Sequence, residues 1–233
     1  MVENEGKRLH TLAETSREQG NSLEALKYTD EALLAYQTAG NKLGMAEVLS
    51  SRSITFRHLW QKTEDKSYLT IAKANQTSAI AIARESGDAR ALAIPLFQLA
   101  NVQEALGEFP EAVATYQEAL TNIINNPPET HNRPAVIADF KIHLATCEYK
   151  AGDKSVLSRA EAALAELEEA EEPDVYAKDV WISGGYMRLA EIVKTDDTEK
   201  AKTYLEKAKN IIDANPKLTI RKQQFDKLAK SFN

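Results

Sequence analysis

Apolar and small residues recur along the chain with helical spacing, and the pattern itself repeats at long intervals. The dipeptide Leu-Ala marks the copies, at Leu12-Ala13, Leu99-Ala100, Leu144-Ala145 and Leu189-Ala190. The last three copies lie 45 residues apart. Around the first copy, Leu9, Leu12, Ala13 and Ser16 follow the i, i+3, i+4, i+7 spacing of one helix face. A fixed period of this kind indicates a helical repeat protein.

Each repeat is predicted to be a hairpin, in which a first helix turns back into a second helix. Gly20, Gly107 and Gly152 follow the repeated alanine by seven residues, and Asp197 takes the fourth such position. These residues tolerate the turn conformations that end a helix. Nine identities link the first unit to the third at a fixed shift of 87 residues, which indicates a true repeat. In the third unit they are Leu96, Leu99, Ala100, Gly107, Glu111, Ala112, Glu118, Ala119 and Leu120.

Alanines five and twelve residues after the turn glycine, as in Gly20-Ala25-Ala32 and Gly107-Ala112-Ala119, resemble the tetratricopeptide repeat. Tyr116 stands at that family's aromatic position. The resemblance implies an all-α, right-handed α-solenoid of about five helical hairpins with a C-terminal capping helix. We expect a single domain over residues 1–233, with repeats at about 6–39, 43–86, 90–127, 134–171 and 175–215 and a capping helix at 217–232. The period of about 40 to 47 residues exceeds the family's usual length, so HEAT and armadillo solenoids are the structural alternative.

Two units depart from the pattern. In the second unit, Arg52-Ser53 replaces Leu-Ala, and extra residues around Gln61 to Ser67 predict a longer first helix, through Trp60, followed by a wider loop. In the third unit, Pro95 predicts a kink or a late helix start. Glycine and proline clusters predict loops between hairpins at residues 40–41, 87–88, 125–134 and 172–174. The capping helix is predicted from the amphipathic set Leu218, Arg221, Phe225, Leu228 and Phe232.

Charge and cysteine content limit the classes of partner and the cell compartment that we expect. The net charge of -6 gives no reason to expect nucleic acid as a partner. The single Cys147 cannot form an internal disulfide, which favours a reducing compartment. No apolar stretch has the length of a signal peptide core or a membrane span. We therefore expect a cytoplasmic protein without a membrane partner.

No residue pattern predicts an enzyme, a metal site or a cofactor. The histidines at positions 10, 58, 131 and 143 lack a metal-binding helix spacing, and phosphate-binding and nucleophile motifs are absent. Ser183-Gly184-Gly185 is interpreted as a site of kinking or close packing. Asn75-Gln76-Thr77 matches a glycosylation sequon inside a helical pattern, where we do not expect it to be used.

Two charged segments suggest a further hypothesis. Residues 161–174 contain seven acidic residues and no basic one, whereas residues 198–233 carry nine basic against four acidic residues. Ordinary solubilising charge is the simpler interpretation of both. The alternative is a salt-sensitive homodimer in which the acidic segment of one copy meets the basic segment of another.

The resemblance implies that the first helices line a concave groove and that function resides there. The expected groove residues are His10, Glu14, Arg17, Ser50, Ile54, Arg57, Phe97, Asn101, Glu104, Ile142, Thr146, Tyr149, Met187 and Glu191. Their mixed polar and apolar character favours a protein or peptide segment as the ligand.

Chaperone-binding members of the family clamp a carboxylate with a basic and amide set. The corresponding positions here are His10, Glu14, Ser51, Ile94 and Gln98, none of which matches. The sequence therefore predicts a non-catalytic adaptor. A small-peptide sensor like those of bacterial regulators, and a structural homo-oligomer whose groove is filled by its own C-terminal helix, remain the alternatives.

Overall fold

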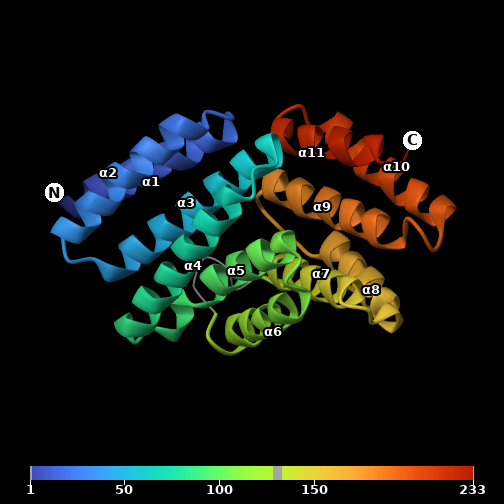
Figure 1. Ribbon diagram of the computed structural model, residues 1–233, viewed down its shortest axis with the longest axis horizontal. Helices are drawn as coiled ribbons and strands as arrows, with labels where there is room; N and C mark the ends of the chain where they lie inside the picture. The colour runs from blue at the N-terminus through green and yellow to red at the C-terminus, as the bar shows by residue number, and fades with distance from the viewer. Residues whose placement is uncertain (1, 128–132, 233) are drawn as a thin grey trace. The chain divides into compact units, whose positions relative to one another are not determined.

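The computed structural model describes residues 2–127 and 133–232, and all of their regular structure is helical (Figure 1). The α-helices are α1 (Val2–Glu18), α2 (Ser22–Thr38), α3 (Lys42–Thr63), α4 (Ser67–Ser86), α5 (Ala93–Leu106), α6 (Phe109–Asn125), α7 (Pro134–Lys150), α8 (Leu157–Glu169), α9 (Val175–Val193), α10 (Thr198–Ala214) and α11 (Thr219–Lys230). Short 3-10 helices precede α5 at Ala89–Ala91 and α8 at Lys154–Val156. The prediction of an all-α chain of five hairpins and one further helix is confirmed. His131 and part of the predicted loop at 125–134 lie outside the described residues.

The chain divides into two compact units, Met1–Pro128 and Glu129–Asn233. The first unit contains α1 to α6, and the second contains α7 to α11. Within each unit, the two helices of a hairpin pack on each other, and consecutive first helices are also in contact.

Small residues hold each hairpin together. Ala13, Ala25 and Ala32 in the first hairpin are fully buried, as are Ala112 and Ala119 in the third. An alanine at the crossing of two helices lets the backbones approach closely, while larger neighbours fill the groove beside it. The repeated alanines are therefore packing residues, as their spacing indicates.

Glycines end the first helices as predicted. Gly20, Gly107 and Gly152 have φ of +81°, +83° and +115°, values that residues with a Cβ adopt only with strain.

The sequence interpretation of the second unit was partly wrong. Helix α3 is longer than its counterparts but continues past Trp60 to Thr63, and only three residues separate it from α4, so the extra residues lengthen the helix and not the loop. Nothing in the segment Gln61 to Thr63 breaks a helix.

Pro95 marks a late helix start. It lies in the first turn of α5, which begins at Ala93 after a short 3-10 helix. A proline is tolerated there because the first backbone N–H groups of a helix have no partner within the helix. The predicted late start is confirmed.

The second unit closes with α11 packed on α9 and α10. Leu218 and Phe225 are buried in the same apolar cluster as the cores of α7 to α10. Close packing also explains the two glycines of α9. A Cβ on Gly185 would come within 2.8 Å of Leu164, and a Cβ on Gly184 would come within 3.0 Å of the Arg221 guanidinium. The interpretation of this glycine pair as a packing site is confirmed.

Candidate functional site

The candidate site is the face of the first helices, considered separately in each unit. All fourteen expected groove residues lie on first helices, on α1, α3 and α5 in the first unit and on α7 and α9 in the second. Nine of them are buried: Arg17, Ser50, Phe97, Asn101, Glu104, Ile142, Thr146, Tyr149 and Met187. His10, Ile54 and Arg57 are half-buried, and Glu14 and Glu191 are exposed. The helices therefore present a few side chains to solvent above a layer of buried polar and apolar side chains.

In the first unit, Arg17 joins α1 to α3. Its guanidinium Nη1 donates to Ser51 Oγ at 2.7 Å and to the Ser51 carbonyl at 3.3 Å. Glu14, one turn earlier on α1, lies 4.0 Å from Arg17 and 3.8 Å from His10 Nε2. Because only Glu14 of these three side chains is exposed, this end of the face presents a carboxylate backed by two basic groups.

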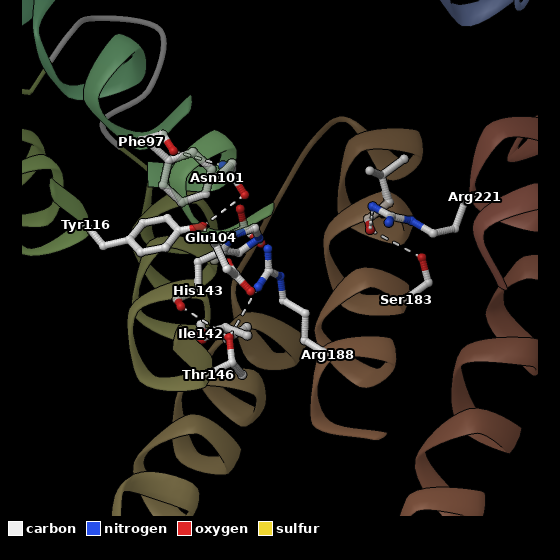
Figure 2. A network of polar contacts seen from close by, with 12 residues as sticks. Phe97, Asn101, Glu104, Tyr116, Ile142, His143, Thr146, Ser183, Arg188 and Arg221 are labelled. Atoms are coloured by element: carbon white, nitrogen blue, oxygen red, sulfur yellow. Dashed lines mark hydrogen bonds and ion pairs between the residues drawn. The ribbon is translucent and has the colours of Figure 1, made fainter. Parts of the chain in front are cut away.

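Further along the first unit, a tyrosine of α6 ties together three expected groove residues of α5. The Tyr116 hydroxyl lies 3.0 Å from Asn101 Oδ1 and 2.9 Å from Glu104 Oε2, and it has one proton to donate (Figure 2). The Tyr116 ring meets Phe97 edge to face, with centroids 5.6 Å apart. Asn101 Nδ2 in turn donates to the Phe97 carbonyl at 2.9 Å. These contacts hold the polar side chains of α5 in fixed orientations.

In the second unit, the polar groups of α7 and α9 meet each other. Thr146 Oγ1 donates to the carbonyl of Ile142 at 2.9 Å, and the same Oγ1 accepts from Arg188 Nη1 of α9 at 3.4 Å (Figure 2). One turn further along α7, Lys150 forms an ion pair of 2.6 Å with Glu191. Arg188, which the sequence analysis did not select, is one residue from the expected position of Met187.

Tyr149 stabilises the carboxyl end of α7. Its hydroxyl donates to Asp196 at 2.5 Å, and Lys154 contacts the same carboxylate at 2.6 Å. The bond to Asp196 raises the pKa of Tyr149 to about 12. Because Tyr149 is buried and its hydroxyl is engaged in this contact, its role in the candidate site is structural.

A buried carboxyl group of α7 lies within the electrostatic influence of half-buried arginines on α9 and α11. Asp139 of α7 is buried, and His143 Nε2 lies 3.8 Å from its Oδ1. Burial raises the pKa of Asp139 to about 7, although the charges of Arg188 and Arg221 act in the opposite direction. Arg221 of α11 also donates to the Val180 carbonyl of α9 at 2.9 Å. Charged groups of α9 and α11 thus act on the buried carboxyl group of α7.

Sequence reasoning missed Asp139, Arg188 and Arg221 as site residues. Arg221 was selected only as part of the amphipathic capping helix. The available signal was Asp139 itself, a lone acid within the largely apolar segment from Pro134 to Phe140. A charge inside a helix that is buried on most sides requires partners from neighbouring helices.

The acidic segment 161–174 has partners within the second unit. Glu161 pairs with Lys200 at 2.6 Å, and Glu166 pairs with Lys141 at 2.6 Å. Glu172 is buried and bonded to Arg133. The hypothesis that this segment meets the basic segment of another copy remains a prediction.

Two further sequence features can be placed. Asn75 of the sequon is buried and donates to the Ile71 carbonyl at 2.7 Å, and Cys147 is buried. Within residues 2–127 and 133–232, no cluster of three or more His, Cys, Asp or Glu side chains is arranged as a metal site. In the same residues, no helix combines the length and apolar character needed to cross a bilayer.

The arrangement of helices is similar to that of solved tetratricopeptide-like proteins. BtubC (BKLC) from P. vanneervenii matches with a TM-score of 0.65 and 22% identity, over 91% of this chain and 82% of that chain. A Rap protein complexed with competence and sporulation factor matches with a TM-score of 0.71 and 16% identity, over 98% of this chain. The TPR-like repeats of a putative kinesin light chain from Podosopora anserina match with a TM-score of 0.59 and 14% identity, over 91% of this chain and 96% of that chain.

The chain spans 57% of the length of the Rap protein. No protein-family model and no curated protein matches the sequence. At the identities of the structural matches the likeness is one of fold, and it confirms the predicted tetratricopeptide-like repeat.

Proposed function

We propose that the chain is a non-catalytic interaction module that binds a protein or peptide segment on the faces of its first helices. The observation that carries this proposal is the set of charged side chains on the first-helix faces, where Arg57 and Arg188 are half-buried and Asp139 is buried. Burying charge in a helical core is costly, and apolar residues of similar size usually stabilise a fold at least as well. Charged groups retained on this face are therefore assigned a recognition role.

The exposed and half-buried members of the expected groove set are proposed to touch the ligand. They are His10, Glu14, Ile54, Arg57 and Glu191, together with Arg188. Among the buried members, Arg17 contacts Glu14 and Thr146 contacts Arg188. A few oriented polar groups beside apolar ones are typical of surfaces that bind an extended segment.

The structural neighbours support a binding role for this fold. The Rap protein was solved in a complex with competence and sporulation factor, so a similar array of helices binds a partner there. The proposed adaptor acts in the cytoplasm, a location that the low cysteine content of the sequence favours.

A peptide library displayed on phage and selected on the immobilised full chain tests the proposal. Peptides that are enriched are then measured by calorimetry against the wild type, Arg57→Gln and Arg188→Gln. Loss of a half-buried guanidinium contact is expected to weaken binding about tenfold or more in at least one of these variants. Arg84→Gln is the matched control, because Arg84 is exposed on the second helix α4.

Two results would contradict the proposed function. One is the absence of any enriched peptide that binds the wild type in solution. The other is a peptide whose affinity falls with Arg84→Gln but not with either first-helix variant, which would place recognition on the opposite side of the hairpins.

A further inference from the structure

Helix α2 has two opposite faces of different character. One face packs into the first unit through four buried residues, Ala25, Thr29, Ala32 and Tyr36. The opposite face consists of Leu23, Lys27, Asp30 and Leu34. The two leucines are 81% and 65% exposed, and the Lys27 and Asp30 side chains are 70% and 59% exposed. We call these four residues the outer seam of α2.

Exposed leucines are not a requirement of the repeat. At the corresponding positions α4 carries Thr70, Ala74, Thr77 and Ala81, and α6 carries Pro110, Ala114, Gln117 and Thr121. All eight of these residues are exposed. At these four positions the neighbouring second helices therefore carry small and polar residues. The leucines of α2 are specific to that helix, and isolated surface leucines do not account for their alignment on one seam.

The outer seam has the spacing of a coiled-coil interface. Its residues follow one another at intervals of four, three and four positions, which is the alternation of a and d positions in a heptad. Helices that pair in this way interdigitate a and d side chains from both partners. The leucines occupy the two ends of the seam, and the two opposite charges occupy its centre.

The charges of the seam determine which orientation of two identical helices is favourable. In an antiparallel pair, Leu23 of one copy faces Leu34 of the other, and Lys27 faces Asp30 of the other. In a parallel pair, each residue would face its own equivalent, which would bring like charges together at both central layers. Polar residues at such positions are known to fix register and orientation at some cost in stability. The pattern is thus self-complementary only about a two-fold axis that is perpendicular to the helices.

We propose that the outer seam of α2 binds a second copy of this chain, with the two α2 helices antiparallel. The contact joins Leu23 to Leu34 at both ends of the seam and Lys27 to Asp30 at its centre. Within one chain, Asp30 contacts Arg52 at 3.0 Å and Lys27 contacts Glu31 at 3.9 Å. Such exposed ion pairs contribute little and can rearrange when the seam is covered.

The proposed contact is short. A helix of 17 residues is about 25 Å long, so the pair buries less surface than a standard stable interface. The dimer is therefore weak and forms at high micromolar protein concentration. This contact is separate from the first-helix faces assigned above to ligand binding, and it does not depend on that assignment.

Sedimentation velocity on the full chain, from about 5 to about 500 µM, tests the dimer. The wild type is expected to show a concentration-dependent shift toward a dimer, and Leu23→Glu and Leu34→Glu are each expected to weaken it about tenfold or more. Ile124→Glu is the matched control, because Ile124 is 53% exposed on α6 of the same unit. A wild type that stays monomeric, or a dimer that is weakened equally by the control, overturns the proposal.

Cysteine cross-linking tests the orientation. A mixture of Leu23→Cys and Leu34→Cys proteins is expected to form a disulfide-linked dimer of the two different chains, because these positions face each other. Leu23→Cys alone is expected to give no more cross-linked dimer than the wild type. Its two cysteines would lie about 16 Å apart along the helices, beyond the reach of a disulfide. The buried native cysteine is present in every sample as the baseline. Efficient cross-linking of Leu23→Cys with itself would indicate parallel pairing and would overturn the antiparallel contact.

Discussion

The ring of Tyr36 lies directly against the backbone of Gly44. A Cβ built on Gly44 would come within 2.5 Å of Tyr36 Cδ1, and one built on Gly6 would come within 2.8 Å of Cε1 on the same ring. Tyr36 belongs to α2, while Gly6 belongs to α1 and Gly44 to α3. One aromatic ring thus fixes the spacing of three consecutive helices. This close packing is possible because the two helical residues that the ring touches are glycines.

Gly44→Ala is expected to destabilise the first unit by about 1 to 3 kcal/mol, because the added methyl group overlaps a buried ring that cannot move outward. Urea denaturation measures the change. In a Tyr36→Leu background the same substitution should cost much less, since the overlapping ring atoms are gone. Equal costs in both backgrounds would show that the ring does not set the helix spacing.

Ala112→Leu is expected to cost about 1 to 3 kcal/mol in stability, because Ala112 is fully buried where α6 crosses α5. Ala114→Leu provides the control on the same helix, since Ala114 is exposed. The control should change stability by less than about 0.5 kcal/mol. Thermal or chemical unfolding compares the two, and similar losses would contradict the packing role of the repeated alanines.

Asp139→Asn is expected to change how stability depends on pH. The pKa of Asp139 is raised to about 7 in the fold from an ordinary value of 3.8, so the folded chain holds this proton more tightly than the unfolded chain does. The resulting stabilisation is present at low pH and is lost as the pH rises from about 4 to about 7. Because asparagine does not titrate, this pH-dependent loss of stability should be absent from the variant.

The stability of Asp139→Asn relative to wild type should therefore rise by on the order of 2 kcal/mol between pH 5 and pH 7. Urea titrations of both proteins at several pH values measure this difference. A constant offset across the range would mean that Asp139 ionises in the fold as it does in water.

Phe225→Ala is expected to destabilise the second unit by about 3 kcal/mol, because Phe225 is buried in the same cluster as the cores of α9 and α10. Gln223→Ala on the exposed side of α11 is the control and should have little effect. Circular dichroism during urea unfolding follows both variants. A negligible effect of Phe225→Ala would contradict the role of α11 as the end cap of the array.

Local signals in the sequence were sufficient for the helices and turns. Periodic apolar residues around Leu12 and Leu99 predicted the helices, and Gly20 and Gly107 predicted the turns, because both depend on neighbouring residues alone. The error after Trp60 also has a local cause. Extra residues without a glycine or proline can extend a helix as easily as a loop, and only the helix packed beside them selects between the two outcomes.

The contacts of the candidate site could be predicted less well from the sequence. Repeat register placed the expected residues on the first helices, but it could not indicate that Asn101 and Glu104 are held by Tyr116 or that Arg188 projects beside Thr146. Those contacts depend on the rotation of each helix about its own axis. Packing at the crossing sets that rotation, and a shift of one residue changes the direction of a side chain by about 100°.

The sequence by itself determined the number of hairpins, the turns at Gly20, Gly107, Gly152 and Asp197, and the alanines at the helix crossings. These features follow from helix period and from residues whose backbone preferences are intrinsic. Tertiary structure alone decided that Tyr36 lies between Gly6 and Gly44 and that Asp139 is buried under the influence of charges from α9 and α11. Contacts between residues far apart in the chain depend on how whole helices approach one another, and no local pattern specifies that approach.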